Sequence, residues 1–271
     1  MKTHFRLADP ISIALFAAFG AVITYLMAPL VLIVLNSFNT STYGAFPPPG
    51  FTLDWYVKAL FQVPDFRLGL VNSLIVATAS TLVSVTLGVL AAYALTRYRF
   101  RQRETVRIVL MLPLFLPSIV VGAALFVLFI LVSLYGTLTS LVLSHALLNM
   151  PFVITVISAN LKTFSPQYEE AAMDLGANGI RTFFEITLPN IRFGIMLATV
   201  LAFVLSFDQV DISLFLARPQ TITLPIAMFK YTENYQDPTL AAVASLMILF
   251  AALVALVAIW LLTRSRLSTY L

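Results

Sequence analysis

The sequence contains no cysteine and very few charged residues. Of its 271 residues, 10% are Asp, Glu, Lys or Arg, whereas 60% are hydrophobic. Without cysteine the chain can form neither a disulfide framework nor a thiolate metal site. With so little charge, a soluble domain of this length could not cover its surface. The composition therefore predicts a protein that crosses a membrane several times.

Motifs for nucleotide binding and for hydrolysis are also absent. No glycine is followed by Lys-Ser or Lys-Thr, so the chain has no phosphate-binding loop of its own. Neither HExxH nor GxSxG, the motifs of zinc peptidases and serine hydrolases, occurs in the sequence. We therefore expect no catalytic residue, no metal site and no bound cofactor. If ATP drives the activity, another subunit must bind it.

Six apolar stretches have the length of membrane-spanning helices. A helix that crosses the hydrocarbon core needs about 20 mostly apolar residues. The predicted spans cover roughly residues 11–38, 68–96, 108–132, 138–159, 193–216 and 238–262. The sequence therefore predicts an all-α polytopic membrane protein with six transmembrane helices, in which residues 1–271 form a single domain.

Small residues recur at every fourth position of the second span, namely Ser80, Ser84, Gly88 and Ala92. Residues spaced by four lie on one face of a helix, and small side chains let a second helix approach closely. We interpret this stripe as a packing seam. His145 in the fourth span has no acid or second histidine at metal-ligand spacing, so we interpret it as a hydrogen-bonded packing residue.

The segments that flank the spans give further expectations. Pro113 and Pro117 should kink the third span, because each removes a backbone donor. Residues 217–237 have the composition of a polar loop, and Asp237 with Pro238 should start the sixth helix. Within that loop, Tyr231, Glu233 and Tyr235 are either interfacial residues or contacts for a second protein.

The lysines and arginines are distributed unevenly between the two sides of the predicted bundle. Six spans place both termini on the same side, and lysine and arginine are enriched on the cytoplasmic side. With cytoplasmic termini, only Lys58, Arg67, Arg218 and Lys230 lie outside. The twelve on the inside are Lys2, Arg6, Arg97, Arg99, Arg101, Arg103, Arg107, Lys162, Arg181, Arg192, Arg264 and Arg266. Residues 164–192 therefore face the cytoplasm.

The cytoplasmic segment 164–192 has the signals of two short helices. Ser165 and Pro166 are typical of a helix start, and Gly176 of a helix end, so a first helix is expected over 166–175. A second is expected over about 178–187, ending before Pro189. Helix signals alone do not distinguish a docking element from an ordinary amphipathic loop on the membrane.

The residue pattern of this segment does distinguish them. Glu170-Ala171-Ala172, Gly176 six residues after the glutamate, and Ile186-Thr187-Leu188-Pro189 match the EAA motif without an insertion. The segment thus resembles the EAA loop of ABC importer permeases, and the resemblance implies a type I (MetI-like) permease fold. In that family the first short helix couples the permease to its ATPase. The residues assigned to coupling by this resemblance are Tyr168, Glu170, Ala171, Ala172, Asp174 and Gly176.

The resemblance extends over most of the chain. Phe51-Thr-Leu-Asp54-Trp55-Tyr56, Leu205-Ser-Phe-Asp208 and Thr223-Leu-Pro225 are similar to segments of the second permease of spermidine/putrescine-type importers. The implied function is the permease subunit of a binding-protein-dependent importer for a polyamine or another cationic amino compound. That group also carries opines and amino-acid-like solutes, so these cargoes are the alternative. One departure is Gln209, where the group often has a second acid beside Asp208.

The resemblance also implies the partners and the location of the chain. The expected partners are a second permease, two ATPase subunits that bind ATP and Mg²⁺, and an extracytoplasmic solute-binding protein. The resemblance favours a second permease that is a different chain. Membrane lipid surrounds the spans, and no nucleic acid is expected. The expected location is the bacterial inner membrane. A self-sufficient secondary transporter, the rival class, should have charges at the midplane of its spans.

Two acids at the end of the fifth span are candidates for the substrate pathway. Asp208 and Asp211 are three residues apart, which would place them on one face of a continuous helix. A carboxylate inside a membrane costs about 2.5–3.5 kcal/mol on insertion scales and so normally faces a cavity or a partner. The two acids would suit a cationic solute. The alternative is that they mark the point where the span leaves the membrane.

Overall fold

A computed structural model describes residues 10–267, and Lys2 and Arg6, which entered the topology argument, lie outside this range. Every regular element within the range is a helix, and the only pairing of extended backbone is an isolated bridge between Asn39 and Phe51. The all-α prediction is confirmed. The helices gather in two compact units, residues 10–63 with 231–249 and residues 64–230 with 250–267.

The first unit contains a long apolar helix and a folded loop. Helix α1 (Pro10–Ser37) carries apolar side chains on all sides, and most of them are exposed. The loop that follows ends in α2 (Asp54–Val57) and the π-helical turn η1 (Lys58–Gln62). The Trp55 indole donates to the Asn39 carbonyl at 2.7 Å and so fastens α2 to the loop.

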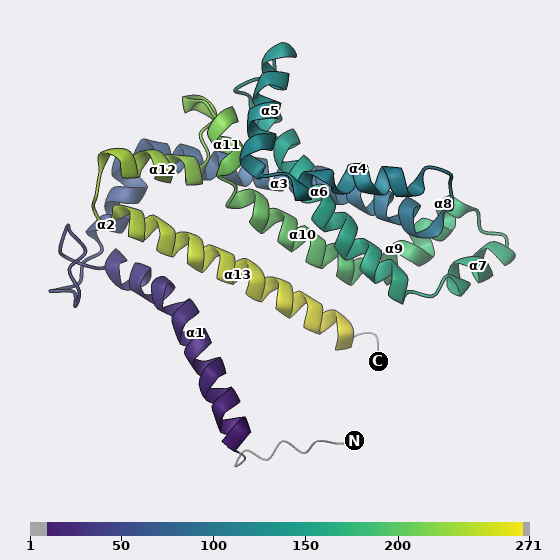
Figure 1. The fold of residues 1–271 in the computed structure, drawn as a ribbon, viewed down its shortest axis with the longest axis horizontal. Helices are drawn as coiled ribbons and strands as arrows, with labels where there is room; N and C mark the ends of the chain where they lie inside the picture. Colours follow the sequence, from purple (N-terminus) through teal and green to yellow (C-terminus); the bar gives the residue numbers. More distant parts are fainter. Residues whose placement is uncertain (1–9, 268–271) are drawn as a thin grey trace. The chain divides into compact units, whose positions relative to one another are not determined.

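Three helices form the centre of the second unit and lie side by side in Figure 1: α3 (Pro64–Arg97), α6 (Leu138–Thr163) and α10 (Arg192–Phe207). Gly88 allows a close approach of α3 and α6, since a Cβ built on it would lie 2.5 Å from Val153 Cγ1. The other members of the small-residue stripe are fully buried. The packing seam predicted from the sequence is confirmed.

The first half of α3 also holds a distant segment of its own unit. Asn72 Nδ2 donates to the Ile222 carbonyl at 2.9 Å, and Ser73 Oγ accepts from the Leu224 amide at 2.9 Å. A Cβ on Gly69 would lie 2.9 Å from Leu224 Cα, so the two backbones touch. These contacts fix the start of α12 (Leu224–Asn234) against α3.

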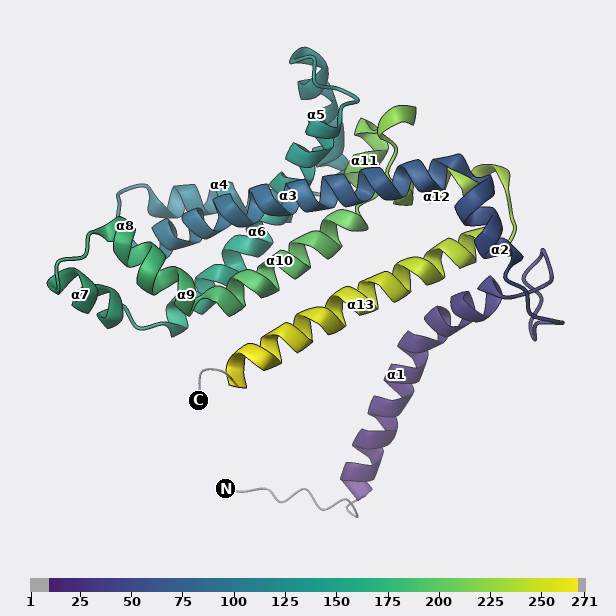
Figure 2. The same cartoon turned by 180° about the vertical axis from the view of Figure 1, so that it is seen from behind.

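The predicted span over 108–132 consists of two helices, α4 (Arg103–Phe115) and α5 (Ser118–Leu131), bent by 106° relative to each other. Pro113 lies inside α4 without ending it, whereas Leu116, which precedes Pro117, is extended. A residue before proline is disfavoured in the helical region, which explains the position of the break. Helix α4 packs against α6, and Figure 2 shows α5 turning away from α4.

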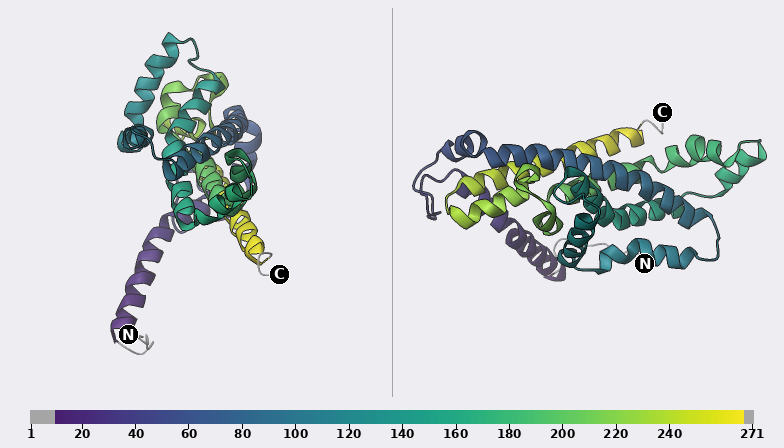
Figure 3. Two further views of the ribbon diagram at one scale, coloured as in Figure 1. Left: turned by 90° about the vertical axis from the view of Figure 1, so that its right-hand side faces the viewer. Right: turned by 90° about the horizontal axis from the view of Figure 1, so that it is seen from above.

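The predicted span over 193–216 also ends early. Helix α10 stops at Phe207, and after a break at Asp208–Val210 the chain continues as α11 (Asp211–Leu216). Helix α11 packs against α5, as Figure 3 shows, and its Ile212 and Leu216 are fully buried. The expectation of one continuous helix to residue 216 is therefore wrong, because Ile212 and Leu216 belong to a separate packing layer.

Residues 217–237 are mostly helical, which corrects the expectation of a polar loop. After the 3₁₀ turn η3 (Pro219–Thr221), α12 extends from Leu224 to Asn234. Its Ala227 and Tyr231 are buried at a spacing of four, while Lys230 and Glu233 are exposed. Asp237 Oδ1 accepts from the Thr239 amide at 3.0 Å and caps α13 (Thr239–Leu267), as predicted.

The described residues contain four helices that are long and apolar enough to cross a membrane. Up to six spans result if each of two bent pairs, α4 with α5 and residues 179–190 with α10, counts as one. The four are Ser12–Ser37, Pro64–Arg97, Leu138–Thr163 and Thr239–Trp260. The prediction of several membrane-spanning helices is confirmed, and the number six and the cytoplasmic termini stay predictions.

Candidate functional site

The candidate site is the segment 164–192, whose first helix is α7 (Gln167–Asp174). Its end has the geometry of a Schellman motif, because the Gly176 amide bonds to the Met173 carbonyl (2.9 Å) and the Ala177 amide to the Ala172 carbonyl (3.0 Å). Gly176 has φ +93°, a conformation that favours glycine. The predicted helix end at Gly176 is confirmed.

The other ends within the segment differ slightly from the prediction. Pro166 occupies the N-cap of α7, while Ser165 Oγ accepts from the Gln167 amide at 3.4 Å. The second helical stretch starts at Asn178, whose side chain caps α8 (Gly179–Thr182). It continues through the π-helical turn η2 (Phe183–Thr187) and α9 (Leu188–Asn190), so the expected stop before Pro189 is wrong.

Pro189 is the second residue of α9, which follows directly after the π-helical turn η2. Helices α7 and α8 lie together at one end of the second unit in Figure 1. The segment is therefore a compact pair of short helices joined at Gly176, as its helix signals predicted.

The outward face of α7 combines apolar and acidic groups. Leu175 is 90% exposed, Tyr168 is 64% exposed and Met173 is 47% exposed. Five of the residues assigned to coupling are exposed and Ala172 is half-buried; the exposed five are Tyr168, Glu170, Ala171, Asp174 and Gly176. The structure thus brings all six together on one short element. Their side chains leave a surface on which a partner could pack.

The inner face of α7 is held by a residue that sequence reasoning did not single out. Glu169 alone among the residues of α7 is buried, at 5% exposure. Its Oε2 lies 2.6 Å from Arg97 Nε, and its Oε1 accepts from Thr187 Oγ1 at 2.6 Å. The adjacent pair Glu169-Glu170 could have indicated a buried acid. Neighbouring residues of a helix point about 100° apart, so the two carboxylates cannot share one face.

The two candidate acids of the substrate pathway lie on either side of the helix break at 208–210. Asp208 is the C-cap of α10 and Asp211 is the first residue of α11, so the expected common helical face does not exist. Both side chains are exposed. Asp211 accepts a hydrogen bond from Ser118 Oγ at the start of α5.

A buried polar network begins at Ser206, two residues before Asp208. His145 Nδ1 is 2.8 Å from Ser206 Oγ, and His145 Nε2 is 3.0 Å from Ser213 Oγ. Ser206 in turn bonds Ser80 at 2.8 Å, so α3, α6, α10 and α11 share the network. His145 is 1% exposed, and its interpretation as a hydrogen-bonded packing residue is confirmed. No three His, Asp or Glu side chains within residues 10–267 gather where a metal ion could bind.

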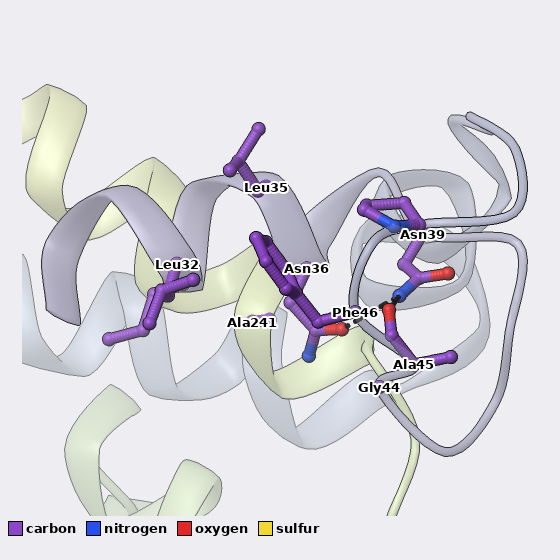
Figure 4. A pocket seen from close by; sticks show the side chains of 10 residues that line it. Leu32, Leu35, Asn36, Asn39, Gly44, Ala45, Phe46 and Ala241 are labelled. Atoms are coloured by element: carbon purple, nitrogen blue, oxygen red, sulfur yellow. Dashed lines mark hydrogen bonds between the residues drawn. The ribbon is translucent and has the colours of Figure 1, made fainter. Parts of the chain in front are cut away.

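The first unit has a cavity of about 550 Å³ between α1 and the loop that follows it (Figure 4). Its lining is mainly apolar and includes no charged side chain. Asn39 Nδ2 donates to Asn36 Oδ1 at 3.3 Å and to the Ala45 carbonyl at 2.8 Å. Because these amides already hold the loop to the helix, we assign no ligand to the cavity.

Comparisons with known proteins place these features in context. Residues 84–266 match the family described as "Binding-protein-dependent transport system inner membrane component". The chain is 32% identical over 246 residues to the spermidine/putrescine transport system permease protein PotC of Escherichia coli (strain K12), covering 91% of this chain and 92% of PotC. It is 33% identical over 255 residues to the putrescine transport system permease protein PotI of the same strain, covering 90% and 88%.

A solved structure shares the fold. The crystal structure of a bacterial ABC transporter involved in the import of the acidic polysaccharide alginate superposes with a TM-score of 0.74 at 16% identity. The superposition covers 97% of this chain and 99% of the other. At this identity the likeness concerns the fold alone, and it agrees with the type I (MetI-like) permease fold expected from the EAA motif.

Proposed function

The chain belongs to the family of binding-protein-dependent transport system inner membrane components, and we propose that it imports a polyamine or a related cationic amine. The family membership makes it a permease subunit of an ABC importer and a transport protein rather than an enzyme.

The observation that carries the cargo proposal is the similarity to two polyamine permeases along nearly the whole chain. Identity of 32% to PotC and 33% to PotI covers 91% and 90% of this sequence. A cationic cargo also fits the acids at the break between α10 and α11. Asp208 and Asp211 offer exposed carboxylates where two helices end and begin. A carboxylate pairs with an ammonium group by a charge-assisted hydrogen bond.

The outward face of α7 is the proposed contact for the ATPase. Tyr168 and Leu175 offer exposed apolar area, Ala171 and Ala172 allow close approach, and Glu170 adds a charge that can pair with a basic partner. Exposed apolar groups rimmed by polar ones are typical of protein interfaces. Each of two ATPases, which bind ATP and Mg²⁺, would contact one permease, and closure of the ATPases would move α7.

The proposed topology has six spans and cytoplasmic termini in a bacterial inner membrane. It counts each bent pair as one span and follows the lysine and arginine asymmetry of the loops. With this topology segment 164–192 faces the ATPases, and the break at 208–210 lies toward the outer side. A solute-binding protein would deliver cargo there, and a second, different permease chain would complete the pathway.

Co-purification tests the assignment of α7. Glu170→Arg reverses an exposed charge on the outward face, and we expect it to remove the ATPase from the purified complex. The matched control is Glu104→Arg, which reverses an acid of 70% side-chain exposure on α4. If Glu170→Arg still retains the ATPase, the docking surface is wrong.

Uptake of spermidine by the reconstituted complex with its binding protein tests the cargo. Asp208→Asn should lower uptake while leaving ATPase co-purification unchanged. Asp211→Asn keeps a side chain that can accept from Ser118 and should lower uptake less. Undiminished uptake by Asp208→Asn would contradict the pathway assignment, and failure of any polyamine to stimulate ATP hydrolysis would contradict the cargo class.

A further inference from the structure

A buried ion pair ties α7 to α3, the longest helix among residues 10–267. Arg97 is the last residue of the 34-residue helix α3, and its Nε lies 2.6 Å from Glu169 Oε2 in the first turn of α7. The two side chains are 12% and 6% exposed. Charged side chains are almost never buried unless they are paired, so each of these two depends on the other as its partner.

Both partners make additional bonds that fix their orientation. The Arg97 guanidinium donates from Nη2 to the Phe164 carbonyl at 3.0 Å and lies 5.7 Å from the centre of the Phe164 ring. The second oxygen of Glu169 accepts from Thr187 at 2.6 Å, and Thr187 is fully buried in η2. One carboxylate therefore joins three elements, α3, α7 and η2.

The carboxylate of Glu169 attaches α7 directly to α3. The backbone of α7 packs chiefly against η2 and α8, which belong to the same cytoplasmic segment. Seven of its eight residues are not buried. No residue of α7 belongs to the apolar cluster of α3, and the apolar route between them passes through Phe183 of η2, which packs on Tyr93 of α3. The Arg97–Glu169 pair, in contrast, joins α7 to the end of α3 directly.

We propose that Arg97 and Glu169 form the joint through which α7 moves α3 during the transport cycle. Both are positioning residues: Glu169 holds α7 from inside, and Arg97 carries its displacement into α3. The inference rests on the proposed docking of an ATPase on α7. It goes beyond that proposal because it names buried residues that cannot touch the ATPase.

A distance measurement tests the joint directly. Because the chain has no native cysteine, Leu90→Cys on α3 and Gln167→Cys on α7, both exposed positions, give a single spin-labelled pair in this chain, with cysteine-free partner subunits. In the full complex we expect one narrow distance that stays the same with and without trapped ATP, since α3 and α7 move together. With Glu169→Gln in addition, the distribution should widen about twofold, because a buried guanidinium loses its counter-charge.

Two further variants make the result decisive. Arg97→Lys keeps the charge but loses the fork that reaches the Phe164 carbonyl, so it should widen the distribution less than Glu169→Gln. Glu185→Gln, an exposed acid of η2 paired with Arg181, is the matched control and should leave the distance unchanged. A wild-type distance that changes on ATP trapping, or a Glu169→Gln distribution as narrow as wild type, would overturn the joint.

The outcome is separable from that of the docking proposal. Retention of the ATPase by Glu170→Arg contradicts docking on the outward face of α7 and leaves the label distances as they are. Widening in Glu169→Gln with the ATPase still bound supports the joint. In that variant, spermidine uptake per ATP hydrolysed should fall about tenfold, because the motion of α7 no longer reaches α3.

Discussion

Lys58 Nζ lies 2.6 Å from Asp237 Oδ2, and the two residues join the turn η1 to the start of α13 within the first unit. The same ammonium group lies 5.7–6.0 Å from the ring centres of Trp55, Tyr231 and Tyr235. Three aromatic rings and one carboxylate thus enclose a single cation. Distances of this size are within the range of cation–π attraction.

The pair makes the stability of the first unit depend on pH. The hydrogen bond to Asp237 raises the pKa of Lys58 above its ordinary value of 10.5, although burial opposes it. Burial acts to raise the pKa of Asp237, but bonds from Lys58, Thr239 and Tyr231 outweigh it and hold this pKa below 3.8. The contribution of the pair is therefore present in full between these ordinary values. It is lost as pH falls through the depressed pKa of Asp237 or rises through the raised pKa of Lys58.

Thermal unfolding of the purified complex, followed from pH 3 to 8, checks this dependence. Asp237→Asn should lower the free energy of unfolding by about 1–3 kcal/mol at pH 7, because Lys58 loses a charged partner. The deficit relative to wild type should shrink as pH falls below 3.8. Glu233→Gln, an exposed acid in α12, is the control. A deficit that is constant with pH would contradict the assignment.

Gly88→Ala should destabilise the packing of α3 against α6. The added Cβ would lie 2.5 Å from Val153 Cγ1, and overpacking of a tight core costs about 1–3 kcal/mol. Val153→Ala in addition should recover part of the loss, which a double-mutant cycle on thermal unfolding would measure. Gly20→Ala in α1, where nothing lies within 4 Å, is the matched control and should not destabilise the protein.

Gly176→Ala should weaken the segment 164–192 through backbone strain alone. Nothing lies within 4 Å of a Cβ at this position, but its φ of +93° is unfavourable for a residue with a side chain. The expected cost is about 1–2 kcal/mol, seen as faster limited proteolysis at residues 175–178. Gly179→Ala has equally open surroundings and no positive φ, so equal proteolysis of the two variants would contradict the prediction.

His145→Leu should leave the hydroxyls of Ser206 and Ser213 without a partner they have in the wild type. A buried polar group that loses its hydrogen bond costs about 1–3 kcal/mol. Ser213→Ala should lower the free energy of unfolding less in the His145→Leu background than in the wild type. In that background the substitution removes a buried hydroxyl that has already lost its hydrogen-bond partner. Strict additivity of the two unfolding energies would contradict the network.

Periodicity and composition were sufficient to predict the helical class, the packing seam and the helix end at Gly176. Each of these follows from local chemistry: apolar runs of span length, small residues at a spacing of four, and a glycine where the backbone turns left-handed. The breaks near Pro117 and Asp208 were harder to place. Apolar residues continue through the first break, and the polar residues Asp208, Gln209 and Asp211 at the second are followed at once by another apolar stretch, so hydropathy alone extends each span across its break.

The candidate site was predicted on its outer face and missed on its inner face. The motif pointed to Glu170, which is exposed, whereas the buried partner of Arg97 is Glu169. The two partners are 72 positions apart in the sequence. Local sequence patterns do not show that the end of α3 and the start of α7 meet in the fold. Likewise α12 looked polar because Lys230 and Glu233 are prominent, while Ala227 and Tyr231 bury the opposite face.

The length of α3 has a mechanical consequence. Gly69 touches the backbone at Leu224, and 28 residues further along the same helix Arg97 holds Glu169. At about 1.5 Å per residue these two contacts are roughly 42 Å apart along the helix. If α3 tilts by about 5° about one contact, the other is displaced by about 4 Å. Helix α3 is thus a lever long enough to turn a small rotation at one end into a side-chain-sized displacement at the other.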